Sequence, residues 1–163
     1  MNPPYTIVRT LETSRPPNCN EGQSRLAVSV VFTSLDGTAA ALQSARAMAR
    51  DLGAVIQLEA PVEVPWQLPL DRPPVPLAFT EQMLTKLVDR LELEEFAPGI
   101  HVYLCRNRLD ALARVLRPES LVVIGGRRRW WPTVESRLAR TLAGWGNRVT
   151  FVDAAGRSWL NLQ

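Results

Sequence analysis

The sequence predicts an α/β domain in which five strands alternate with four helices. Apolar runs of four to seven residues recur along the chain, and between them apolar residues repeat at the three- and four-residue spacing of amphipathic helices. Alternation of this kind is typical of right-handed β-α-β crossovers. We therefore expect a three-layer α/β/α architecture, with a five-stranded parallel sheet covered by helices on both faces.

Each expected element has its own signal. A helix can begin at a cap on Asp36 or Thr38 and end at Gly53, a second can begin at Thr80, and a fourth can follow Pro132, which suits a first helical turn. The third helix has its apolar positions at Leu109, Leu112, Ala113 and Leu116. The expected strands are residues 26–32, 54–58, 101–105, 121–124 and 149–152.

The chain divides into an arm, a domain and a tail. Residues 1–24 are rich in proline and polar side chains and are expected to form an N-terminal arm or disordered leader, in which residues 5–8 could pair as an edge strand. Residues 25–153 form the domain and residues 154–163 the tail. The proline-dense residues 61–76 are expected to be an extended surface connection, favoured over a proline-motif ligand.

Composition argues against several functional classes. The 163 residues carry a net charge of +3 and contain no apolar run of the length that a membrane span needs, nor a secretory leader, so we expect a cytoplasmic protein. Two cysteines are too few for a disulfide framework, and Cys105 lies in an apolar run, as a buried thiol would. The single histidine, His101, leaves little room for a metal site or a hydrolytic triad. We therefore expect a non-catalytic protein with no metal site.

The most distinctive segment follows the fourth expected strand. There the chain reads Gly125-Gly126, three arginines, two tryptophans, Pro132 and Thr133. In an open parallel sheet, ligands bind in loops at the carboxyl ends of the strands. Guanidinium groups bind phosphate or carboxylate, and a helix start offers free backbone donors, so this loop is a candidate anion site.

Residues 26–152, about three-quarters of the chain, resemble the universal stress protein family. The likeness is carried by the strand Val28 to Phe32 with the helix that ends at Ala49-Arg-Asp-Leu-Gly53, by residues 106–113 at the start of the third helix, and by residues 121–125 with the arginine loop after them. The resemblance implies strand order 3-2-1-4-5, as in adenine nucleotide alpha hydrolase-like and flavodoxin-like folds. It also implies a cytoplasmic stress-response role and ATP or AMP as the ligand.

The sequence departs from the motif of the family's nucleotide-binding members. In those members an Asp ends the first strand, and a glycine-rich loop closed by a Gly-Ser or Gly-Thr pair wraps the phosphates. Here Thr33 stands at the Asp position, with Asp36 as a nearby substitute, and Arg128 or Arg129 replaces the second glycine. The loop is shorter and lacks the closing pair, so the glycine motif is incomplete.

The strand order implied by the resemblance brings the ends of strands one and four together. The candidate ligand site is accordingly Thr33, Ser34, Asp36, Gly125, Gly126, Arg127, Arg128, Arg129 and Thr133. Alternatives stay open: the arginines could pair with nearby carboxylates in a solvated loop, and Trp130 and Trp131 could cap the end of the sheet, stack a base or form a protein-binding hot spot.

Three functional hypotheses follow. The first is a non-catalytic, universal-stress-protein-like regulatory domain that binds a nucleotide or another phosphate ligand at the candidate site. It would form a homodimer through the last strand, Val149, Thr150, Phe151 and Val152, as the resemblance implies. The second is a ligand-free module that docks on a protein partner through the arginine-tryptophan loop. The third is single-stranded nucleic-acid binding, against which the lack of a second basic stripe argues.

Overall fold

The computed structural model describes residues 5–11, 26–93 and 96–154. Its strands are β1 (Tyr5–Leu11), β2 (Ala27–Val31), β3 (Val55–Glu63), β4 (Gly99–Cys105), β5 (Leu121–Gly126) and β6 (Arg148–Asp153). Its helices are α1 (Leu35–Leu52), α2 (Leu77–Arg90), α3 (Arg108–Val115) and α4 (Val134–Gly144). The remainder of the expected arm, and the tail from residue 155 on, lie outside the described residues.

All six strands form one sheet in the order β1-β4-β3-β2-β5-β6. The strands β4, β3, β2, β5 and β6 are parallel. This confirms the predicted five-stranded parallel sheet with order 3-2-1-4-5. The strand β1 adds an antiparallel edge next to β4, with Tyr5 opposite Cys105 and Leu11 opposite Ile100, so the edge pairing considered for residues 5–8 is present and extends to Leu11.

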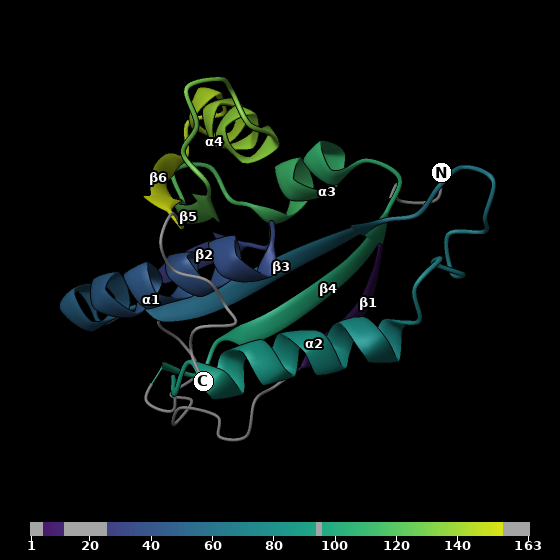
Figure 1. Ribbon diagram of the computed structural model, residues 1–163, viewed down its shortest axis with the longest axis horizontal. Helices are drawn as coiled ribbons and strands as arrows, with labels where there is room; N and C mark the ends of the chain where they lie inside the picture. Colours follow the sequence, from purple (N-terminus) through teal and green to yellow (C-terminus); the bar gives the residue numbers. More distant parts are fainter. Residues whose placement is uncertain (1–4, 12–25, 94–95, 155–163) are drawn as a thin grey trace.

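The helices form two layers around the sheet. Figure 1 shows α1 and α2 on one side of it and α3 and α4 on the other. One core joins α1 and α2 to Val28, Val30 and neighbouring strand residues, and a second joins α3 and α4 to Val31, Val122 and Ile124. Because successive strand residues point to opposite faces, the buried strands are apolar on both sides, as the continuous apolar runs predicted.

Two helix starts differ from the prediction. The cap of α1 is Ser34, whose side-chain oxygen accepts from the backbone N–H of Gly37, and neither Asp36 nor Thr38 is the cap. The helix α2 begins at Leu77, not after Thr80. Its N-terminal cap is Pro76, whose ring fixes φ at −55° and which makes no side-chain capping bond. When proline precedes the first helical residue, the sequence has no Ser or Thr cap to mark the start of the helix.

The expectation that residues 61–76 are a surface connection is wrong for its first part. Pro61 lies within β3, a central strand, where proline is normally excluded. Pairing between β2 and β3 ends at Glu59, whose carbonyl accepts from Phe32 N–H. Residues two apart on a parallel strand direct their backbone N–H and C=O groups to the same neighbouring strand, so the nitrogen of Pro61, like the backbone of Glu59, faces β2. Because β2 has already ended at this level, no hydrogen bond of the sheet is lost.

The rest of this connection is held in place by one arginine. Arg106, directly after β4, donates through Nη1 to the carbonyl of Val64 (3.0 Å) and through Nη2 to that of Leu68 (2.9 Å). Its guanidinium also lies 5.1 Å from the ring centroid of Trp66. The segment is therefore anchored to the carboxyl end of β4.

Candidate functional site

The carboxyl ends of β2 and β5 meet as expected, but the space between them is filled. Thr33 Oγ1 donates to the carbonyl of Gly125 at 2.7 Å. A Cβ on Gly37 would lie 2.8 Å from Thr33 Oγ1, and a Cβ on Gly125 would overlap the carbonyl of Gly37. The first turn of α1 thus packs backbone to backbone against the end of β5, and glycine at both positions is what permits this approach.

The polar side chains at this strand end are engaged in the fold. Ser34 Oγ caps α1, and Thr33 N–H donates to Thr38 Oγ1 at 3.2 Å. Asp36 faces Arg127 Nη2 at 3.9 Å, with both side chains partly exposed, so the pair contributes at most about 1 kcal/mol. The predicted residues are brought together, and they hold α1 to β5.

The remaining predicted residues border a hollow on the α4 side of the sheet. This hollow has a volume of about 320 Å³ and lies between the loop after β5, the first turns of α4 and Phe151 of β6. Of the predicted residues, it is lined by the three arginines and Thr133. Sequence reasoning missed Ser136, Arg140 and Phe151, which also line it. For Ser136 and Arg140 the signal was helical spacing, since both lie on the face of α4 that continues from its cap, Thr133.

Two backbone features fix the loop after β5. The N–H of Arg128 donates to Asp153 Oδ1 at 3.1 Å, which joins the loop to the end of β6. Thr133 Oγ1 caps α4 by accepting from Ser136 N–H at 3.1 Å, and Ser136 Oγ donates back to the Thr133 carbonyl at 3.0 Å. The Thr133 hydroxyl is therefore engaged in capping, although it lies at a helix start where anions bind.

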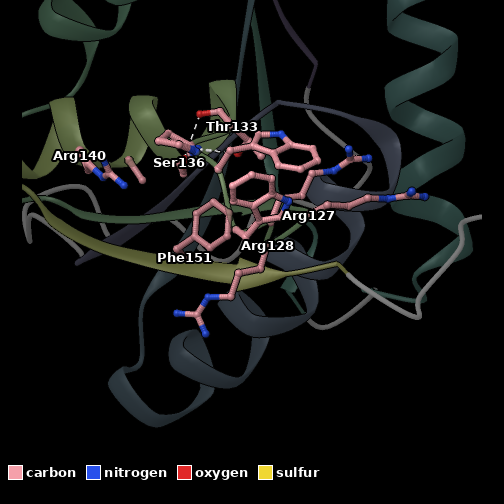
Figure 2. Close-up of a pocket in the computed structure, with 11 residues that line it drawn as sticks. Arg127, Arg128, Thr133, Ser136, Arg140 and Phe151 are labelled. Carbon is pink, nitrogen blue, oxygen red and sulfur yellow. Dashed lines mark hydrogen bonds between the residues drawn. The ribbon is translucent and has the colours of Figure 1, made fainter.

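The arginines of the hollow do not converge. Figure 2 shows the side chains of Arg127, Arg128 and Arg140 pointing in different directions, while Thr133 and Ser136 lie together at the start of α4. A phosphate clamp made of arginines needs their guanidinium groups directed at one point. The resting geometry is thus that of a basic rim around an apolar floor and not that of a formed phosphate cradle.

The two tryptophans are exposed. Trp130 is 91% exposed and Trp131 45%, and their rings are in edge contact with centroids 4.7 Å apart. Arg129 lies over the ring of Trp131 at 5.5 Å. The alternative that this pair caps the sheet end does not hold for Trp130, which covers almost nothing. We call residues 127–131 the Arg-Trp loop.

A buried polar cluster on the sheet was also missed. Glu59, at the centre of β3, is 2% exposed and accepts a hydrogen bond of 2.6 Å from the Tyr103 hydroxyl. His101 Nδ1 lies 3.2 Å from the same carboxylate. The sequence signal was available, because polar residues recur at every second position on both strands, at 57 and 59 and at 101 and 103. The expected strand 54–58 stopped one residue too early to include it.

We predict that His101 titrates above its ordinary pKa of 6.5. The hydrogen bond from the imidazolium to Glu59 raises the pKa of His101 and outweighs burial, which lowers it. The Glu59–His101 contact therefore stabilises the fold fully below about pH 6.5 and loses this contribution as the pH rises through the native pKa. Because the chain has one histidine, an NMR titration of its ring resonances measures this directly. In Glu59→Gln the pKa should fall below 6.5, and an unchanged value would exclude Glu59 as the cause.

Cys105 is confirmed as a buried thiol. It is fully buried, and burial raises its pKa to about 11. A thiol in this state is neutral at physiological pH and is a poor nucleophile.

No group of three or more His, Cys, Asp and Glu side chains among the described residues is placed to hold a metal ion. In the same residues, no helix is long and apolar enough to cross a membrane. Comparison of the chain with family models, curated proteins and solved structures gave no match in any of the three.

Proposed function

We propose that this protein is a non-catalytic regulatory domain that docks on an acidic protein segment through the Arg-Trp loop. The observation that carries the proposal is the exposure of Trp130, at 91%, beside Trp131 and three exposed arginines. Large aromatic side chains and arginine dominate protein-binding hot spots. Exposing an indole to this degree has no benefit for the folded monomer.

The charge of the loop argues for an acidic partner. Arg127, Arg128 and Arg129 contribute three positive charges within one short loop, and Arg140 adds a fourth at the rim of the hollow. The apolar floor beneath them includes Phe151, Pro132 and Ala139. A partner segment with carboxylates beside an aromatic or aliphatic side chain would match both features.

The fold is that expected from the resemblance to universal stress proteins, and we include the family role, regulation in response to stress, in the proposal. The strand order supports it. The proposal does not include the family's nucleotide site between β2 and β5, because the Gly37–Gly125 contact occupies that space.

A second candidate function is binding of ATP or AMP in the hollow beside the Arg-Trp loop. Its support is the hollow itself, whose volume of about 320 Å³ is within the range of small-molecule sites and whose rim combines arginines with an aromatic ring. Native mass spectrometry and calorimetric titrations with ATP, AMP and cyclic AMP test it. Micromolar binding weakened about tenfold by Arg140→Ala would favour the nucleotide; no binding would leave the docking function alone.

We also propose a homodimer formed through β6. Among the described strands β6 pairs only with β5, and its side chains Val149, Phe151 and Val152, which pack on the two faces of the sheet, are all partly exposed. An unpaired edge of this kind favours addition of a second strand. Light scattering should show a dimer for the wild type and a monomer for Thr150→Lys, whose charge on an exposed edge position disfavours pairing. A wild-type monomer at high concentration would contradict the dimer.

A further inference from the structure

A second hollow lies at the opposite end of the parallel strands from the Arg-Trp loop. It has a volume of about 580 Å³ and is enclosed by the start of β2, the start of β5 and the C-terminal end of α3 with the connection after it. Its floor is the α3 face of the sheet, where Ser29, Gln57 and Glu59 come from two neighbouring strands. None of the predicted site residues lines it.

Two polar side chains on this floor make no hydrogen bond to another described residue. Ser29 is 6% exposed and Gln57 is partly buried, and within residues 26–93 and 96–154 neither the Ser29 hydroxyl nor the Gln57 amide has a hydrogen-bond partner. Polar side chains that face a hollow and are not engaged in the fold are available to a molecule that enters it. Both side chains line the hollow, where such a molecule would satisfy them.

The hollow contains one buried carboxylate and several hydrogen-bond acceptors. Glu59 contributes a carboxylate that already accepts from Tyr103 and faces His101, and a carboxylate can accept further bonds. The wall includes Val115 and Leu116 at the C-terminal end of α3, where the helix dipole is negative. At the rim, the exposed charges of Arg117 and Glu119 oppose each other.

We propose that this hollow binds a small aliphatic amine, with its ammonium group donating to Glu59 and its chain or second amine reaching Ser29 and Gln57. A protonated amine supplies three hydrogen-bond donors and a positive charge. These complement the acceptors and the carboxylate of the floor and the negative end of the α3 dipole. A volume of about 580 Å³ is sufficient for a diamine or a short polyamine.

His101 provides a built-in reporter for the test, since it is the chain's single histidine and contacts Glu59 directly. An ammonium group at Glu59 competes with the imidazolium for the carboxylate and adds a like charge, so binding should lower the pKa of His101. We would titrate the full chain with putrescine and follow the His101 ring resonances by NMR, with 1,4-butanediol, an uncharged molecule of the same length, as the matched ligand control.

Putrescine should bind and lower the His101 pKa, and 1,4-butanediol should do neither. Glu59→Gln should lower the affinity for putrescine at least about tenfold, and Ser29→Ala should lower it severalfold. Arg128→Ser, at the other hollow, should leave the affinity unchanged. Ser29→Ala keeps the carboxylate network, so it remains informative if Glu59→Gln fails to fold. No response to about 10 mM putrescine, an equal response to the diol, or wild-type affinity in both floor variants would overturn the proposal.

Discussion

Replacing Gly125 with alanine should destabilise the domain by about 3 kcal/mol or more. The added methyl group would overlap the carbonyl of Gly37, and the contact is between two backbone segments that cannot rotate away as a side chain could. Overpacking in a tight interior typically costs about 1–3 kcal/mol, and more when the backbone must move. Urea unfolding followed by circular dichroism measures the loss as a lower midpoint at an unchanged slope.

Gly144→Ala is the matched control for this prediction. Gly144 is the last residue of α4, and nothing lies within 4 Å of the position that its Cβ would take. The same chemical change should therefore be neutral or stabilise by about 0.5–1 kcal/mol, because alanine is the better helix former. Equal stability of the two variants would show that α1 does not pack against β5 as closely as the structure describes.

Alanine at both Trp130 and Trp131 should abolish docking of an acidic partner. Truncating a hot-spot side chain costs about 2 kcal/mol or more, which corresponds to roughly 30-fold in affinity for each tryptophan. The probe would be acidic peptides selected from a display library on the wild-type protein, with affinities measured by fluorescence anisotropy. Trp130 covers almost nothing but Trp131 is half-buried, so the urea midpoint of the double variant is measured beside its affinity to show that it remains folded.

The control variants are two other tryptophans that are exposed in the described part of the chain. Trp66 is 79% exposed beside Arg106 and Trp145 is 41% exposed at the end of α4, so both offer an indole to solvent away from the Arg-Trp loop. Alanine at either should leave peptide affinity within about twofold. If the peptides bind the double variant as well as the wild type, the loop is not the docking surface. If the affinity for the peptides does not change with salt concentration, the prediction of an acidic partner is wrong.

The sequence predicted the parallel sheet because its strands are apolar on both faces and alternate with helices. It did not predict the full length of β3, since Pro61 argued for a break and only the early end of β2 makes a proline acceptable there. The pairing of Tyr5–Leu11 with β4 was left open because an edge strand carries a weak local signal. In each case the deciding factor was a neighbouring strand and not the local sequence.

The candidate site was predicted in part for a similar reason. Strand order was enough to place Thr33 beside Gly125 and Asp36 beside Arg127. The two glycines, Gly37 and Gly125, allow close packing of α1 on β5 and not the approach of a phosphate. The distance between α1 and β5 decides this, and residue spacing in the sequence does not reveal that distance. The Glu59–His101–Tyr103 cluster needed the register between β3 and β4, where Glu59 is opposite His101.

The most direct test of the docking surface is a pair of NMR titrations of the full ¹⁵N-labelled chain, one with a selected acidic peptide and one with ATP. We predict that the peptide shifts the indole N–H resonances of Trp130 and Trp131 and the amides of residues 127–134, and that ATP leaves the amides of Thr33, Ser34 and Gly37 unchanged. Shifts of those three amides at micromolar ATP, with no response of the Arg-Trp loop to the peptide, would contradict the account and place the binding site between β2 and β5.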